Sequence, residues 1–177
     1  RESVENLVRT GTEHYGQIDI LVNNAGIYKP APFLDYSFED FSNIVNTNLY
    51  SVFHVTQVVL PQMLERKHGR IINISSTAGK WGSRNQSAYN ASKHAVTGLT
   101  RCLGLEVADK GVTVNAICPW IVETDMLSTF KTEHGAIHGA PGDAVMEQVK
   151  NSVPIKRWIQ AEEIAHLAVY LASDESA

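Results

Sequence analysis

Residues 70 to 76 read Arg70-Ile71-Ile72-Asn73-Ile74-Ser75-Ser76, an apolar run that ends in two serines. Branched side chains at successive positions would face both sides of a sheet, which is typical of a buried parallel strand. Ser76 then lies at the carboxyl end of the strand, where open α/β sheets bind their ligands. A helix is expected to follow from about Ala88 to Lys110, with Ser87 as its N-terminal cap.

Tyr89 and Lys93 lie four residues apart in that helix, so their side chains project from one face, about 6 Å apart along the axis. A free tyrosine has a pKa of about 10, and a nearby ammonium group lowers that value because it favours the phenolate. The pair suits proton transfer to or from an alcohol oxygen, to which Ser76 could also hydrogen-bond. The alternative is a solvent-facing tyrosine and lysine on an ordinary helix, because such spacings often arise by chance.

Three further motifs accompany this pair in a fixed order along the chain. They are Asn23-Asn24-Ala25-Gly26 after an apolar strand at 18–22, Asn46-Thr47-Asn48 inside a long helix at 38–67, and Val114-Asn115-Ala116-Ile117-Cys118-Pro119 continued by Val122-Glu123-Thr124. Together with Ser76, Tyr89 and Lys93, these motifs resemble the short-chain dehydrogenase/reductase family. The resemblance covers almost the whole chain, and several motifs in the right order are far more specific than any one of them.

The resemblance implies a Rossmann-like α/β fold, a doubly wound parallel sheet with helices on both faces. The alternation of strands and helices along the chain favours the same architecture. We expect one oxidoreductase domain over residues 1–177, with a substrate lid at about 125–155. The helix at 38–67 is expected to be interrupted at Asn46-Thr47-Asn48, since these side chains compete for backbone hydrogen bonds.

The resemblance also implies a set of catalytic residues. Tyr89 would supply or accept the hydroxyl proton, and Ser76 would hydrogen-bond the substrate oxygen. Lys93 would lower the pKa of the tyrosine and hold the nicotinamide ribose, while Asn48 would hold a water that relays protons to solvent. For Asn48, the alternative is a polar kink in its helix.

Cofactor and substrate contacts follow from the same resemblance. The expected cofactor-binding residues are Asn23, Ala25, Gly26, Tyr89, Lys93, Pro119, Val122 and Thr124. Most relatives have glycine at the position of Trp120, so a large ring is added beside the nicotinamide. We expect Trp120 to contact the substrate with Ser76 and Tyr89, although simple packing is an alternative.

The most similar members are bacterial polyketide ketoreductases and 3-oxoacyl-carrier-protein reductases. This similarity implies reversible hydride transfer between NADP, or NAD, and a small-molecule or carrier-protein-bound ketone, most simply a 3-oxoacyl or polyketide thioester. Lys67 and Lys110 match positions that dock the acidic carrier protein, although both would also serve as solvated surface lysines. Two alternatives remain: a 3-hydroxyacid or general alcohol or steroid dehydrogenase, and a non-catalytic cofactor-binding scaffold. The family also implies a homodimer or homotetramer.

The composition favours small-molecule ligands over nucleic acid. The 177 residues are 44% hydrophobic and 19% charged with a net charge of −4, as expected for one globular domain. The basic residues are scattered, which argues against a nucleic-acid surface. No apolar run approaches the roughly 20 residues of a membrane span.

Cysteine and histidine residues indicate neither a disulfide framework nor a metal site. Cys102 and Cys118 are expected to be small core residues, which fits a reducing cytoplasm. His134 and His138 have metal-like i, i+4 spacing, but Gly135 and Gly139 weaken a helix there and no third ligand is evident. We therefore expect no metal.

The chain opens inside a helix expected at residues 4–15, without the strand, glycine-rich turn and helix that hold the cofactor pyrophosphate in the family. It ends after a helix expected from Ala161 to Ala172, before the family's last strand. We interpret the sequence as truncated at both ends. The choice between NAD and NADP cannot be read from it, because the deciding segment is absent, and the reductive role alone favours NADP.

Overall fold

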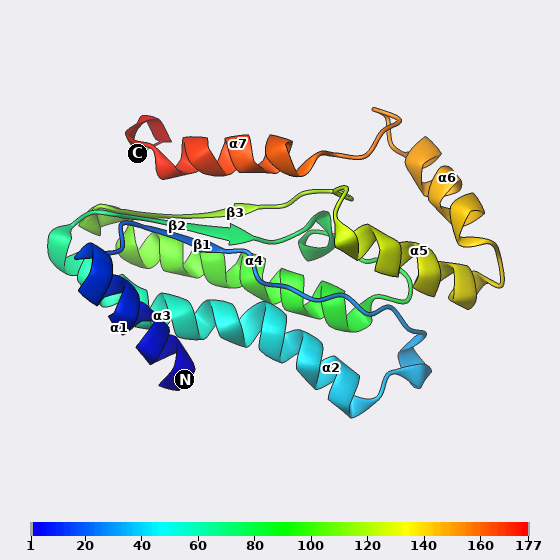
Figure 1. Cartoon of the computed structure of the whole chain (residues 1–177), viewed down its shortest axis with the longest axis horizontal. Helices are drawn as coiled ribbons and strands as arrows, with labels where there is room; N and C mark the ends of the chain where they lie inside the picture. The colour runs from blue at the N-terminus through cyan, green and yellow to red at the C-terminus, as the bar shows by residue number, and fades with distance from the viewer. Residues whose placement is uncertain (1, 177) are drawn as a thin grey trace.

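The computed structural model describes residues 2–176 and has a parallel sheet with helices on both faces (Figure 1). In this part of the chain the strands are β1 (Ile20–Asn23), β2 (Gly69–Ile74) and β3 (Val112–Ile117), in the order β1-β2-β3. Ile72 in the central strand is aligned with Val22 on one side and Asn115 on the other. All carboxyl ends therefore meet at one edge, as the sequence predicted.

Helices α1 (Glu2–Tyr15), α3 (Ser51–Arg66) and α4 (Ser87–Val107) lie on one face of the sheet, and α7 (Ala161–Ala172) lies on the other (Figure 1). The core between the sheet and the first group is formed by buried apolar side chains, among them Val59, Met63, Ile71, Val107 and Val112. Crossover helices between parallel strands cover the sheet in this way and confirm the expected architecture.

The long helix expected at residues 38–67 is divided into three parts. It consists of α2 (Phe38–Val45), a π-helical turn (Asn46–Tyr50) and α3. The Ser37 hydroxyl accepts a hydrogen bond from the Asp40 amide at 3.0 Å and caps the start of α2. The interruption falls at the predicted Asn46-Thr47-Asn48 segment and turns Asn48 into the interior, where it is 1% exposed.

Helices α5 (Asp125–His138) and α6 (Gly142–Ser152) occupy the segment expected to be a polar lid. The expectation that Gly135 would weaken a helix here was wrong. A Cβ atom at Gly135 would lie 3.0 Å from the Ala140 carbonyl oxygen, so the missing side chain lets the following turn pack closely on α5. Gly139 ends the helix with φ of 60°, a conformation that glycine adopts without strain.

Two further expectations about α4 were wrong. Gln86, not Ser87, is the N-cap residue of α4, and the Ser87 hydroxyl is buried without a partner. Cys102 is exposed because it lies on the face of α4 that turns away from the sheet. In α1, Leu7 is 68% exposed and only its neighbour Val8 is buried.

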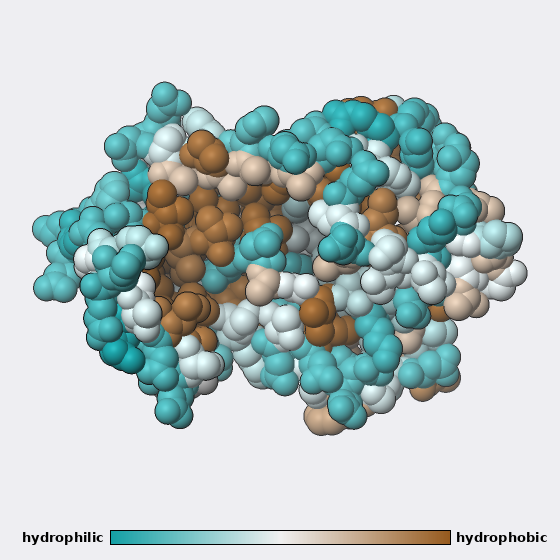
Figure 2. Space-filling model, in the orientation of Figure 1, coloured by the Kyte–Doolittle hydropathy of each residue, from teal (hydrophilic) through white to brown (hydrophobic). Residues whose placement is uncertain are grey.

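Figure 2 shows an apolar area on the surface over the sheet. Ile20 and Val22 of β1 are 47% and 45% exposed, since they lie on the strand that forms one edge of the described sheet. No helix among residues 2–176 combines the length and apolar character needed to cross a bilayer.

A buried polar chain joins the sheet to both of the helices beneath it. The Asn23 amide donates to Asn73 Oδ1 at 2.8 Å and to the Thr56 hydroxyl of α3 at 3.2 Å. The Asn73 amide in turn donates to the Thr100 hydroxyl of α4 at 2.9 Å. Buried amides of this kind stabilise the fold only while their partners remain in place.

We predict that Asn73→Leu lowers the free energy of unfolding by about 2 kcal/mol, because it removes one buried hydrogen-bond partner from the Asn23 amide and one from the Thr100 hydroxyl. Urea unfolding measures the change. Thr113→Val is the matched control, since the Thr113 hydroxyl is buried without a partner and its removal breaks no hydrogen bond. Equal stability of the two variants would contradict the prediction.

Candidate active site

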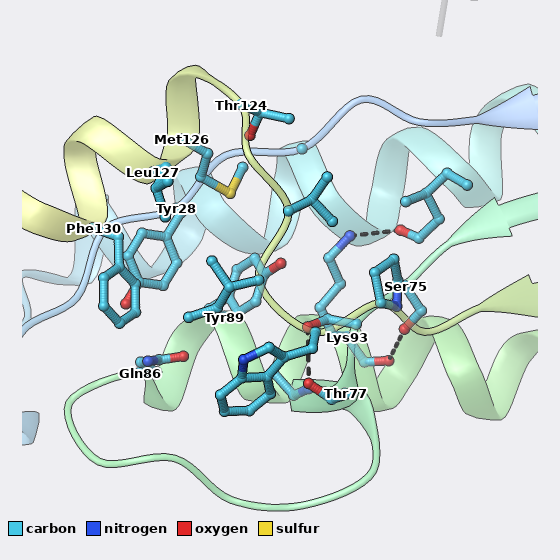
Figure 3. Close-up of a pocket in the computed structure, with 18 of the residues that line it drawn as sticks. Tyr28, Ser75, Thr77, Gln86, Tyr89, Lys93, Thr124, Met126, Leu127 and Phe130 are labelled. Carbon is cyan, nitrogen blue, oxygen red and sulfur yellow. Dashed lines mark hydrogen bonds between the residues drawn. The ribbon is translucent and has the colours of Figure 1, made fainter. Parts of the chain in front are cut away.

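A cavity of about 530 Å³ opens at the carboxyl edge of the sheet, beneath α5 and α6 (Figure 3). Its polar side includes Ser76, Tyr89 and Lys93, which the sequence predicted to act together. Its apolar side is formed by residues from the segment after β3 and from the helices that follow: Trp120, Ile121, Val122, Met126, Leu127, Phe130, Val149 and Ile164. The cavity therefore combines a small polar group of side chains with a large apolar wall.

Hydrogen bonds and a close backbone contact hold the end of β2 against α4. Ser75, which is buried, hydrogen-bonds to the Thr97 hydroxyl at 2.9 Å and donates to the Lys93 carbonyl at 3.1 Å. A Cβ atom at Gly79 would lie 2.6 Å from the same Lys93 carbonyl, so glycine is required where the turn after Ser76 crosses the helix. This junction fixes Ser76 relative to the residues of α4.

Asn90 holds the rest of the loop between β2 and α4. Its amide donates to the carbonyls of Ala78 at 3.1 Å and Trp81 at 2.7 Å, and the side chain is 8% exposed. The loop is thus tied to the helix one residue beyond Tyr89. Local hydrogen bonds, and not the helix alone, position the tyrosine against Ser76.

The Tyr89 phenol is largely buried and hydrogen-bonds with Ser76. Burial raises the pKa of Tyr89, and the hydrogen bond from Ser76 opposes that shift in part. Ser76 Oγ also accepts a hydrogen bond from the Ala78 amide at 3.1 Å, which fixes the hydroxyl at the start of the turn after β2. The sequence predicted that Lys93 would lower the pKa of Tyr89, but in this structure the pKa of Tyr89 is raised by burial, and the opposing effect comes from Ser76.

Lys93 is 5% exposed, and its ammonium group donates to the Ile74 carbonyl at 2.7 Å. The same Nζ lies 5.7 Å from the centre of the Tyr89 ring. Burial lowers the pKa of Lys93 from 10.5 to about 8. The lysine therefore remains mostly charged at neutral pH in a place where that charge is costly, which is typical of a functional site.

Asn48 holds the loop that follows β1. Its Oδ1 accepts from the Ile27 amide at 2.8 Å, and its Nδ2 donates to the Ile27 carbonyl at 3.0 Å and to the Ser92 hydroxyl at 3.2 Å. Both ends of the amide are therefore in use, and the side chain fixes the backbone beside Lys93. The expected water relay through Asn48 stays a prediction.

The predicted cofactor residues divide into two groups. Gly26, Pro119, Val122 and Thr124 line the cavity with Tyr89 and Lys93. A Cβ atom at Gly26 would lie 3.7 Å from Lys93 Nζ, so the missing side chain keeps space open beside the ammonium group. These residues fit the nicotinamide and ribose half of a dinucleotide.

The remaining two predicted cofactor residues lie elsewhere. Asn23 points toward α3 and α4 and belongs to the buried polar chain, while Ala25 is exposed and does not line the cavity. Asn24, between them, does line it. Because side chains alternate along a strand, Asn24 faces the side opposite to Asn23. Cofactor contacts by Asn23 and Ala25 stay predictions.

Sequence reasoning missed an aromatic group in the cavity wall. Tyr28 and Phe130 line it, and their rings lie almost parallel with centroids 5.9 Å apart. Tyr28 also meets Tyr89 edge to face at 5.1 Å. The only sequence signal for these two residues was their position near predicted site residues. Tyr28 follows the end of β1, and Phe130 lies less than two helical turns after Thr124, a predicted cofactor residue.

Lys67 and Lys110 lie away from the cavity. Lys67 is the last residue before the turn into β2, and Lys110 precedes β3, so both stand near the amino ends of strands. They are neighbours, since the backbone of Gly111 approaches that of Lys67 closely. Both are exposed, and docking of a carrier protein on them stays a prediction.

His134 and His138 stack on one another in α5, with ring centroids 5.9 Å apart. Among residues 2–176, no group of three or more His, Cys, Asp or Glu side chains is placed to hold a metal ion. His134 instead pairs with Tyr28.

Comparison with known proteins agrees with this geometry. Residues 1–135 match the model of the short chain dehydrogenase family. The chain belongs to the short-chain dehydrogenase family. A protein assigned as the ketoacyl reductase of the monensin polyketide synthase in Streptomyces virginiae is 42% identical over 177 residues, covering 99% of this chain and 68% of its own length. The 3-oxoacyl-[acyl-carrier-protein] reductase of Thermotoga maritima is 36% identical, covering 99% of this chain and 67% of that protein.

A solved structure shows the same fold. A variant of actinorhodin polyketide ketoreductase, determined with NADPH, has a TM-score of 0.94 and 41% identity, covering 98% of this chain and 67% of that one. The chain thus spans about two thirds of the length of these relatives. The predicted family, the Rossmann-like fold and the class of NAD(P)-dependent oxidoreductase are confirmed.

We predict that Lys93→Met is more stable than the natural chain near pH 7 in the absence of cofactor. Burial of the charge costs about 3 kcal/mol, and the hydrogen bond to Ile74 returns about 1 kcal/mol of that, so the gain is about 2 kcal/mol. Between the folded-state pKa of about 8 and the ordinary value of 10.5, only the unfolded chain holds the proton. The free energy of unfolding of the natural chain therefore rises with pH between these two values. The difference in stability between the natural chain and Lys93→Met becomes smaller over the same range.

Urea unfolding near pH 7 and near pH 10 measures both effects. Lys80→Met is the control, since Lys80 is exposed and its loss changes no buried charge. The prediction is contradicted if the difference in free energy of unfolding between the natural chain and Lys93→Met does not change with pH. Burial of the lysine charge would then cost no stability.

Proposed function

We propose that this protein reduces the ketone group of a 3-oxoacyl or polyketide-like substrate with NADPH. The observation that carries the proposal is the convergence of Ser76, Tyr89 and Lys93 on one cavity that also has a large apolar wall. A phenol that hydrogen-bonds with a serine and lies beside a buried ammonium group is suited to moving a proton at an alcohol or ketone oxygen.

The three side chains divide the proton chemistry among them. Tyr89 is protonated at neutral pH, because burial raises its pKa, and it would donate its proton to the carbonyl oxygen as that oxygen gains charge. Ser76 would donate a second hydrogen bond to the same oxygen. The charge of Lys93 would stabilise the phenolate that remains on Tyr89.

A nicotinamide cofactor supplies the hydride when it is bound. Gly26, Pro119, Val122 and Thr124 would hold its nicotinamide end, and Lys93 would hydrogen-bond the ribose. NADPH is favoured over NADH because an actinorhodin polyketide ketoreductase of the same fold was solved with NADPH. The apolar side chains above Ser76, Tyr89 and Lys93 would exclude water around a bound substrate, which would strengthen the electrostatic interactions there.

The polyketide and 3-oxoacyl relatives support a thioester ketone as the substrate, whether free or on a carrier protein. The alternatives are a 3-hydroxyacid or general alcohol or steroid dehydrogenase, which would use the same centre in the oxidising direction. A non-catalytic scaffold is disfavoured because Ser76, Tyr89 and Lys93 are brought together around the cavity.

Three further features belong to the proposal. Helices α5 and α6 would act as the substrate lid of a single domain. The outer side of α4, where Leu105 is 85% exposed and Cys102 is also exposed, would pair with another copy in a homodimer or homotetramer. Free cysteines are compatible with a cytoplasmic location.

We predict that Tyr89→Phe lowers kcat for ketone reduction by at least about 100-fold, because the proton donor is lost. Cofactor affinity should change little, since the ring and Lys93 remain. The assay follows the absorbance of reduced nicotinamide in the full-length protein, with a 3-oxoacyl thioester and a simple ketone as parallel substrates.

Tyr170→Phe is the matched control for this prediction, because Tyr170 lies on α7 and does not line the cavity. Retained turnover in Tyr89→Phe would contradict the assigned role. Turnover lost in both variants would point to a folding defect, which the far-UV circular dichroism of each variant would reveal.

A further inference from the structure

Tyr28 and His134 lie far apart in the sequence but meet above the cavity. The Tyr28 hydroxyl lies 2.6 Å from His134 Nε2, which joins the loop after β1 to helix α5. His134 is 6% exposed, so the bond is shielded from competing water. In the described structure this bond connects the expected lid to the opposite rim of the cavity.

The direction of the bond follows from the two environments. Burial raises the pKa of Tyr28 far above its ordinary value, so the phenol keeps its proton. Burial and the neighbouring His138 lower the pKa of His134, so its imidazole is neutral at pH 7. The Tyr28 hydroxyl therefore donates to an unprotonated Nε2, and neither group is free to take part in proton transfer at Tyr89.

Aromatic contacts extend from this bond to the reactive centre. His134 stacks on Phe130 with centroids 4.1 Å apart, and Phe130 lies nearly parallel to Tyr28. Tyr28 in turn stands perpendicular to Tyr89, at 86°. Figure 3 shows Tyr28 and Phe130 together at one end of the cavity, with Tyr89 between them and Lys93.

We propose that the bond between Tyr28 and His134 latches α5 over the cavity and sets an aromatic wall, Tyr28 and Phe130, that selects substrates with a flat ring next to the ketone. The inference rests on the proposed ketone reductase function and adds the specificity-determining residues. A flat ring offers the faces and edges that aromatic side chains prefer as partners, whereas a puckered saturated ring does not.

The latch is tested by a double-mutant cycle in the full-length protein, with 2-tetralone as substrate. Tyr28→Phe and His134→Leu each remove the bond and keep an apolar side chain. Each is expected to raise KM about five-fold and to speed amide exchange in α5 by a similar factor, with kcat nearly unchanged. The double variant is expected to be no worse than either single variant.

Two control variants distinguish the loss of the Tyr28–His134 hydrogen bond from a general loss of packing around α5. His134→Gln places an acceptor near the original Nε2 position and is expected to recover most of the KM and exchange protection. Tyr36→Phe removes a phenol that bonds to the Lys29 carbonyl in the same loop, and it is expected to leave α5 unchanged. Additive effects in the double variant, or unchanged exchange in α5, would overturn the latch.

Ring selection has its own measurement. The natural protein is expected to prefer 2-tetralone over 2-decalone, its saturated counterpart, and Phe130→Leu is expected to reduce that preference about five-fold. An unchanged ratio of kcat/KM values would overturn the role of the wall. Absence of turnover with any ketone or thioester would instead contradict the proposed function, while amide exchange, which needs no substrate, would still decide the latch.

Discussion

The hydrogen bond from the buried ammonium group of Lys93 to the Ile74 carbonyl joins the last residue of β2 to helix α4. Around it, Ser75 bonds to the same turn of the helix, and Gly79 lets the chain pass within van der Waals distance of the Lys93 backbone. The positions of Ser76 and Tyr89 both depend on this junction. A serine at a strand end and a tyrosine on a helix face the same cavity because these contacts hold the two elements together.

The same burial that makes the junction rigid also perturbs its charges. The pKa of Lys93 falls and that of Tyr89 rises because both groups lose contact with water. The shift of Lys93 costs stability near neutral pH in the absence of ligand, whereas the shift of Tyr89 costs none there because the phenol is protonated in both the folded and the unfolded chain. The result is a charged lysine beside a protonated phenol in the cavity. Asn48 adds to this arrangement by holding the backbone of Ile27 at the opposite rim.

The sequence predicted that Ser76, Tyr89 and Lys93 would lie together, as they do in the cavity, because the signals for this grouping are local. A strand end places Ser76, helical spacing places Tyr89 and Lys93, and the unfavourable Asn46-Thr47-Asn48 segment marks a break that turns Asn48 inward. The sequence failed where the answer depends on packing between distant segments. No local pattern pairs Tyr28 with His134, and no spacing reveals that burial raises the pKa of Tyr89. The exposure of Cys102 likewise depends on which face of α4 the sheet covers.

The central claim is that a protonated Tyr89 and a charged Lys93 act together on a ketone oxygen. The pH dependence of kcat/KM for ketone reduction, measured with saturating reduced cofactor, tests it most directly. Lys93 has a pKa of about 8, and loss of its charge removes the stabilisation of the developing phenolate. The account predicts a rate that falls as pH rises through this value. A rate that stays level or increases between about pH 7 and pH 10 would contradict it.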